Sequence, residues 1–133
     1  GVVRVIDYKT GAAPVEYSDM NHVFNREKNQ DKALQTLLYC WMFKEMSPDY
    51  LAEHVDVVPH IYAVRTLAKG KDAETRLSSK NKSDFSYTTE VEQELKEALI
   101  NLLREIYNPE LAFVPTSEQT RCDTCLFYEL CKG

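Results

Sequence analysis

The fold of this chain is decided by the stretch Val5-Ile6-Asp7-Tyr8-Lys9-Thr10-Gly11. It closes an apolar run that starts at Val2 and has the high β-propensity of a strand, and its last three residues supply a turn. An unbroken apolar run predicts a strand covered on both faces, as in a mixed or parallel sheet. Asp7 and Lys9 are two residues apart, so they fall on one face of this strand at its exposed end.

The Asp7–Lys9 pair has the residue types that phosphate chemistry uses. A carboxylate at a sheet margin suits a hard divalent cation such as Mg²⁺, which prefers oxygen ligands. An ammonium beside it can orient an attacking water or stabilise charge on a phosphate. Asp-x-Lys is a common spacing, however, and an ordinary ion pair at a strand end explains it equally well when it is taken alone.

A second motif lies on the helix predicted for residues 26–46. Gln35 and Tyr39 are four residues apart and therefore share one helix face. Both side chains can donate a hydrogen bond to a phosphate or hold a metal-bound water. The same helix is expected to bury an apolar face with three- and four-residue spacing. That face comprises Ala33, Leu34, Leu37, Leu38, Trp41 and Met42.

The remaining patterns complete an α/β chain. Residues 12–24 are expected to form a loop, 49–54 a short helix, and 60–65 and 84–87 strands, with a basic hairpin or mobile loop over 67–82. Thr89 and Glu92 form a capping box at the start of a helix that runs to Tyr107. The buried stripe of that helix is expected to contain Val91, Leu95, Ala98, Leu99, Leu102, Leu103 and Ile106.

Together, the strand ending in Asp-Tyr-Lys-Thr-Gly and the helix with Gln-x-x-x-Tyr resemble the RecB-like branch of the PD-(D/E)XK nuclease superfamily, in particular AddB-type nuclease domains. The resemblance implies a restriction-endonuclease-like α/β fold, with a mixed central sheet flanked by helices. It assigns residues 1–112 to a partial nuclease core and residues 113–133 to a cysteine-containing tail.

The same resemblance implies a role for each motif residue. Asp7 would ligate Mg²⁺ or Mn²⁺ together with the backbone carbonyl of Tyr8. Lys9 would position water or stabilise the transition state. Gln35 and Tyr39 would act as catalytic residues that hold the DNA backbone or a water beside the metal.

The chain departs from the family pattern at its start. The family's first catalytic aspartate lies on the strand before the Asp-x-Lys strand, and here only Gly1 precedes Val2. Two carboxylates are normally needed to hold the metal over the scissile phosphate. We therefore expect this chain to be a C-terminal fragment that is nearly inactive alone.

Three cysteines, Cys122, Cys125 and Cys131, lie within ten residues near the C-terminus. Without a secretory signal, a reduced cytoplasmic compartment is expected, where clustered thiols indicate metal ligands before disulfides. In AddB-type nucleases such a trio joins one upstream cysteine around a 4Fe-4S cluster, so the resemblance implies that cluster in the full-length protein. Zinc and no metal stay open as alternatives. Cys40 is expected to be a small buried apolar residue instead of the fourth ligand.

Composition and charge limit the classes of function that are possible. The 133 residues are 44% hydrophobic and 28% charged, which excludes disorder, and no apolar run reaches the roughly 18 residues of a membrane span. The net charge is −5, yet residues 65–82 hold six basic and two acidic side chains. Candidate DNA-binding residues in this stretch are Arg65, Lys69 and Lys71.

These observations favour a Mg²⁺-dependent deoxyribonuclease of exonuclease type that acts in DNA repair and recombination with a helicase partner. The alternative is a non-catalytic DNA-binding or scaffold module that keeps the nuclease fold. A third interpretation is a metal-binding interaction domain organised by the cysteine tail.

Overall fold

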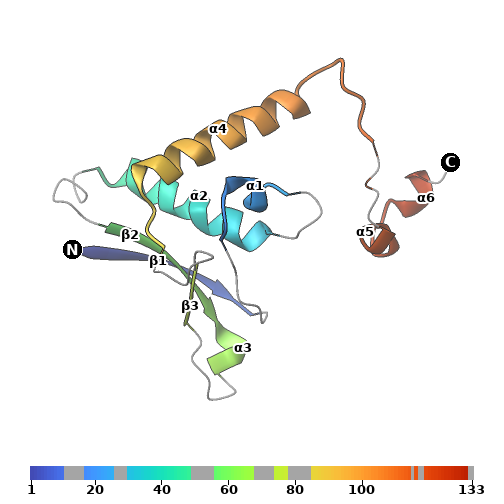
Figure 1. The fold of residues 1–133 in the computed structure, drawn as a ribbon. Coiled ribbons are helices and arrows are strands. Elements are labelled where there is room, and N and C mark those ends of the chain that lie inside the picture. The colour runs from blue at the N-terminus through green and yellow to red at the C-terminus, as the bar shows by residue number, and fades with distance from the viewer. Residues whose placement is uncertain are drawn as a thin grey trace. The chain divides into compact units, whose positions relative to one another are not determined.

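The computed structural model describes residues 1–10, 17–25, 30–48, 56–67, 74–77, 85–114, 116 and 119–131 (Figure 1). The described chain divides into two compact units, residues 1–99 and 100–133. The boundary expected between residues 112 and 113 stays a prediction. The elements in chain order are β1 (Val2–Lys9), α1 (Met20–Val23), α2 (Asp31–Met46), β2 (Asp56–Ala63), α3 (Val64–Leu67), β3 (Glu74–Arg76), α4 (Thr89–Ile106), α5 (Gln119–Asp123) and α6 (Tyr128–Cys131).

The sheet of the first unit is mixed. Its order is β1-β2-β3, with β1 parallel to β2 and β3 antiparallel to β2. The parallel register runs from Val2 opposite Asp56 to Lys9 opposite Ala63. A parallel pair needs a crossover connection, and α2 lies between the two strands in the chain and packs against both. The expected α/β class with a mixed sheet is confirmed for this core, and the sheet packs against helices.

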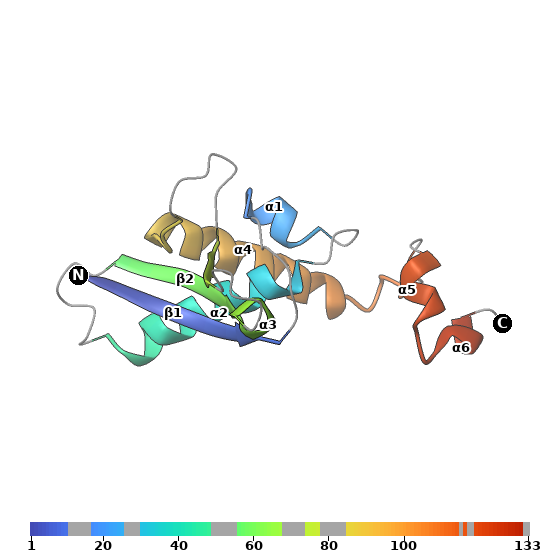
Figure 2. The same cartoon turned by 90° about the horizontal axis from the view of Figure 1, so that it is seen from below.

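One face of β1 is covered and the other is bare within the described residues. Val2, Arg4, Ile6 and Tyr8 are exposed, whereas the alternating positions are buried or half-buried against the helices. Figure 2, seen from below, shows β1 and β2 in front and α2 behind them. The prediction of a strand covered on both faces is therefore wrong for the described chain, because β1 follows the period-two alternation of a strand with one solvated face.

The buried face of α2 differs from the predicted one. Thr36 and Cys40 are buried beside Ala33 and Leu37, whereas Met42 is 53% exposed. These four buried positions have the spacing of one helical stripe centred on Leu37, and Met42 lies outside it. Cys40 is buried as expected, and burial raises the pKa of its thiol to about 12.

Helix α4 begins one residue earlier than a cap at Thr89 would require. The Thr88 hydroxyl oxygen accepts from the Val91 N–H at 3.4 Å, so Thr88 acts as the cap. Leu95 is fully buried, but Leu103 and Ile106, predicted to be buried, are about half exposed. The apolar stripe is thus buried only in the part of α4 that belongs to the first unit.

Several other boundaries change. Residues 20–23 form α1 instead of loop, since the Asp19 carboxylate accepts from the His22 N–H at 2.8 Å. Strand β2 begins at Asp56 and ends at Ala63, so Arg65 lies on α3 and not on a strand. Described residues 85–87 are not a strand, although the Tyr87 N–H donates to the Val57 carbonyl at 2.7 Å. The helix predicted over 49–54 lies outside the described residues, as does most of the 67–82 loop.

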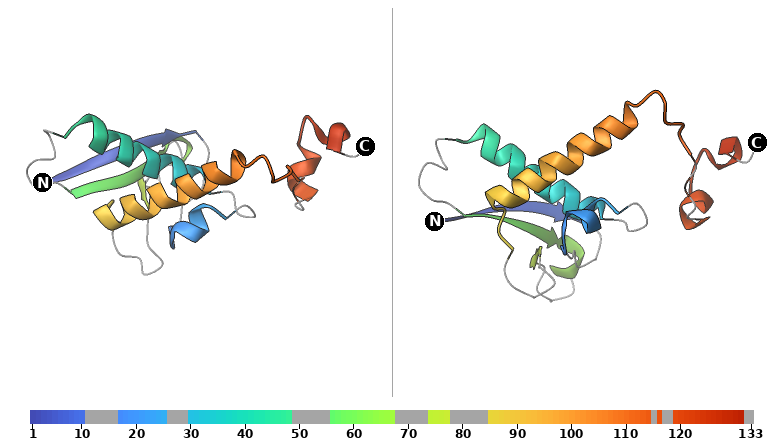
Figure 3. Two further views of the ribbon diagram at one scale, coloured as in Figure 1. Left: turned by 90° about the horizontal axis from the view of Figure 1, so that it is seen from above. Right: turned by 45° about the horizontal axis from the view of Figure 1, so that its top comes forward.

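Charged side chains connect α2 to α4, which lie next to each other in both views of Figure 3. Lys44 Nζ is 2.6 Å from Glu92 Oε2, and Lys96 Nζ is 2.7 Å from Glu92 Oε1. Glu45 accepts from Trp41 Nε1 at 2.9 Å and lies 3.2 Å from Lys96. The capping box predicts that Glu92 reaches back to the cap, and the two ammonium groups take its carboxylate instead. Burial alone would raise the pKa of Glu92, but the hydrogen bonds from Lys44 and Lys96 outweigh it and lower that pKa.

The lowered pKa of Glu92 predicts a pH-dependent contribution to stability. A carboxyl whose pKa falls on folding stabilises the native state at pH values above its ordinary pKa of about 4.3. This stabilisation disappears as the pH falls through the pKa of the folded state. We expect Glu92→Gln to lower Tm by roughly 3–6 °C at pH 7 and by much less at pH 3. Thermal melts at both pH values check this, with Glu94→Gln on the exposed face of α4 as the control. An equal deficit at both pH values would contradict the charge-pair interpretation.

Within the described residues, no helix combines the length and the apolar character that crossing a membrane requires.

Candidate active site

Four motif residues meet at the C-terminal end of β1. Lys9 Nζ lies 2.9 Å from Asp7 Oδ2 and also donates to Gln35 Oε1. Gln35 Nε2 in turn donates to the Tyr39 hydroxyl at 2.6 Å. The strand alternation places Asp7 and Lys9 on the face that α2 covers, and the i, i+4 spacing stacks Gln35 over Tyr39. We call Asp7, Lys9, Gln35 and Tyr39 the quartet.

Exposure increases along the quartet from its carboxylate to its phenol. Asp7 is 8% exposed and the Lys9 side chain 23%, whereas Tyr39 is 38% exposed. Gln35 is half-buried between them. The quartet therefore leads from a buried anion to a hydroxyl that solvent or a ligand can reach.

Oxygen Oδ2 of Asp7 has one polar neighbour within the described residues. It is buried and lies 2.9 Å from the Lys9 ammonium, in an ion pair that is not also a hydrogen bond. A carboxylate oxygen has more than one lone pair, and it is the kind of ligand that a hard divalent cation takes.

The described residues supply only part of a metal-binding site. No group of three or more His, Cys, Asp or Glu side chains is placed there to hold a metal ion. Asp19 lies nearby in the chain, but its carboxylate caps α1. Asp7 would thus be one protein ligand among several, and the described side chains do not form a closed cage.

Of the three candidate DNA-binding residues, the structure describes only Arg65. Arg65 is exposed on α3, which starts directly after β2 and contacts β1. Because Lys9 is opposite Ala63 in the register, Arg65 lies at the same end of the sheet as the quartet. Lys69 and Lys71 fall outside the described residues. One described basic side chain from this set therefore lies at the same end of the sheet as the quartet.

Tyr8 and Tyr62 form an aromatic pair at this end of the sheet, a contact that the sequence pattern does not predict. Tyr8 is 67% exposed on the face opposite Asp7 and Lys9. Its ring centroid lies 5.6 Å from that of Tyr62, its neighbour in the parallel register. Period-two alternation next to Asp7 was enough to place the Tyr8 side chain on this face, although not its contact with Tyr62.

Cys122, Cys125 and Cys131, the cysteine trio, are three free thiols in the second unit. Cys122 is half-buried, Cys125 and Cys131 are exposed, and α5 and α6 bury no residue. Cys122 Sγ lies 3.9 Å from the Thr116 carbonyl oxygen. The iron–sulfur and zinc interpretations of these cysteines both stay predictions.

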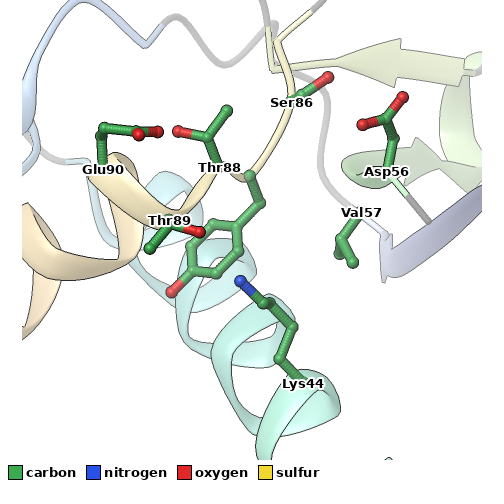
Figure 4. Close-up of a pocket in the computed structure, with 8 residues that line it drawn as sticks. Lys44, Asp56, Val57, Ser86, Thr88, Thr89 and Glu90 are labelled. Atoms are coloured by element: carbon green, nitrogen blue, oxygen red, sulfur yellow. The ribbon is translucent and has the colours of Figure 1, made fainter. Parts of the chain in front are cut away.

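A separate hollow of about 330 Å³ lies at the other end of the parallel strands. Figure 4 shows Lys44 facing the start of α4 across it, and Asp56 on its rim. Asp56 is opposite Val2 in the register, so roughly 23 Å of strand separates it from Lys9. Lys44, which lines this hollow, is already paired with Glu92, and no residue of the quartet lines the hollow. The lining residues are Lys44, Asp56, Val57, Ser86, Tyr87, Thr88, Thr89 and Glu90.

Comparison with protein families identifies a family for this chain. The family described as the PD-(D/E)XK nuclease superfamily matches residues 1–132, a range that includes the whole quartet and the cysteine trio. No curated protein and no solved structure matches the chain. The match is made at the level of the superfamily, so the RecB-like and AddB-type resemblance stays a prediction.

Proposed function

Because the chain belongs to the PD-(D/E)XK nuclease superfamily, we propose that it carries catalytic residues of a metal-dependent deoxyribonuclease that hydrolyses phosphodiester bonds. The observation that supports this most directly is the arrangement of Asp7 and Lys9. A buried carboxylate oxygen lies 2.9 Å from an ammonium that also donates to Gln35. Metal binding and stabilisation of phosphate charge need this combination.

Each residue of the site then has a role. Asp7 Oδ2, with the backbone carbonyl of Tyr8, would hold Mg²⁺ or Mn²⁺, a cation that supplies an activated water and neutralises phosphate charge when bound. Lys9 would orient the attacking water or stabilise the charge that develops on the phosphate. Arg65, and Lys69 and Lys71 beyond the described residues, would bind the DNA backbone.

A second carboxylate would complete the metal site. β1 is an edge strand of the described sheet, so one of its sides carries backbone groups that a further strand can pair with. We propose that such a strand brings a carboxylate next to Asp7. On the RecB-like motifs we extend the proposal to exonuclease-type cleavage in recombinational repair beside a helicase, with a 4Fe-4S cluster on the cysteine trio.

The test is a cleavage assay on linear and circular DNA, with the longest natural polypeptide that contains residues 1–133. We expect cleavage in Mg²⁺ or Mn²⁺, none in EDTA, and a preference for linear DNA. Binding without cleavage under all metal conditions would instead support the non-catalytic DNA-binding module. A protein that neither cleaves nor binds DNA would overturn both proposals.

A further inference from the structure

We infer that the outer face of the sheet, at the end where the quartet lies, is a stacking surface for unpaired DNA bases next to the scissile phosphate. Tyr8 is the residue on which a base would stack, and Tyr62 supports it. This inference rests on the proposed function and deepens it, because it adds a base-binding subsite beside the groups that act on the phosphate.

The bare part of the sheet follows β1 to its end. Alternation places Arg4, Ile6 and Tyr8 on the face that α2 does not cover, and all three are exposed within the described residues. Tyr8 is 67% exposed and Ile6 is 41% exposed. On β2 the same face is buried at His60, which is opposite Ile6 in the register. The open area is therefore confined to β1 and the Tyr8–Tyr62 pair.

Tyr62 orients the Tyr8 ring without covering it. The two ring centroids lie 5.6 Å apart and the ring planes are tilted by 56°, a geometry that aromatic pairs favour. A ring that is already oriented loses little further freedom when a ligand binds to it. Nucleic-acid bases stack on exposed aromatic side chains, and every base has a π face that can do so. The pair thus has the properties of a base-stacking platform.

The charges around this platform suit a polyanion. Arg4 is exposed four residues before Tyr8, about 13 Å away along the strand. Arg65 is exposed on α3, which contacts β1. Asp56, an exposed acid of β2, is opposite Val2 at the far end, about 20 Å of strand from the platform. Basic groups near the tyrosine pair and an acid far from it favour a phosphate backbone as the occupant.

The platform is continuous with the proposed catalytic centre. Tyr8 stands between Asp7 and Lys9, so its side chain leaves β1 on one face and theirs leave it on the other. A DNA strand whose phosphate lies at Asp7 and Lys9 reaches Tyr8 by turning over the end of β1. A duplex is too stiff for this turn, since its persistence length is about 150 base pairs. The platform therefore fits an unpaired segment of the strand.

The experiment compares binding of a short oligothymidine and of a blunt hairpin duplex, by fluorescence anisotropy in EDTA, to the longest natural polypeptide that contains residues 1–133. We expect Tyr8→Leu to reduce the preference for the single strand by about tenfold, because base stacking on the ring is lost. Tyr8→Phe keeps the ring, and its preference should stay within about twofold of wild type. Tyr107→Leu, at an 80% exposed tyrosine of the second unit, is the matched control and should leave the preference unchanged.

A second measurement uses the protein without substitution. Irradiated iododeoxyuridine in the oligonucleotide crosslinks to an aromatic side chain stacked on it, and mass spectrometry should find the crosslink on Tyr8. An unchanged preference in Tyr8→Leu, or crosslinks at other residues only, would overturn the inference, and a protein segment seated on this face would give that result. If the protein still cleaves DNA, the stacking surface alone is then wrong. A crosslink on Tyr8 in a protein that does not cleave DNA would instead contradict the nuclease proposal alone.

Discussion

In the longest natural polypeptide that contains residues 1–133, replacing Asp7 by asparagine is expected to reduce metal-dependent cleavage by about 10³-fold while the fold is kept. Asparagine has nearly the same shape, so the side chain still fits the buried position at the end of β1. It cannot offer a charged oxygen in place of Oδ2, the buried atom that forms the ion pair with Lys9. Single-turnover cleavage at saturating Mg²⁺ measures the loss, and a thermal melt checks that the protein is folded.

The matched control for this prediction is Asp56→Asn. Asp56 is an exposed aspartate at the opposite end of the same parallel strand pair, where it is paired in register with Val2. We expect cleavage by this variant to stay within about twofold of wild type, since a surface substitution away from the site has little effect. Full activity in Asp7→Asn would remove Asp7 from the mechanism, and equal losses in both variants would point to a general charge effect.

Local periodicity was sufficient to predict each half of the quartet. Alternation along a strand places Asp7 and Lys9 on one face, and helical spacing places Gln35 over Tyr39. The contact that joins the halves, Lys9 to Gln35, spans 26 positions of the chain. It depends on α2 packing back across β1, so only the tertiary structure shows which end of the helix meets the strand end.

The errors concern which apolar positions are covered. Helical spacing is satisfied by more than one stripe on α2, and Thr36 and Cys40 are buried where Met42 was expected. Periodicity gives the direction of an apolar face but not the length of the neighbour that covers it. The stripe of α4 is predicted to be buried to its end for this reason. The apolar run of β1 predicts cover on both faces, but such a run does not show whether a second layer is present on the outer face.

Leucine-to-alanine substitutions at two positions of α4 measure how far along the helix the apolar stripe is buried. Leu95 is fully buried in the core of the first unit. Leu95→Ala is expected to lower the free energy of unfolding by about 3 kcal/mol, from the lost transfer free energy and the cavity left behind. For a chain of this size, that corresponds to a fall in Tm of roughly 10 °C.

Leu103→Ala makes the same chemical change two turns later in the same helix, where the side chain is 49% exposed. We expect it to cost less than about 1 kcal/mol, because little area is removed from water there and alanine is a good helix former. Urea unfolding monitored by circular dichroism gives both values with one protocol. Equal losses at the two positions would mean that the stripe is buried along its whole length in solution, as its sequence pattern predicts, by a surface that the described residues do not include.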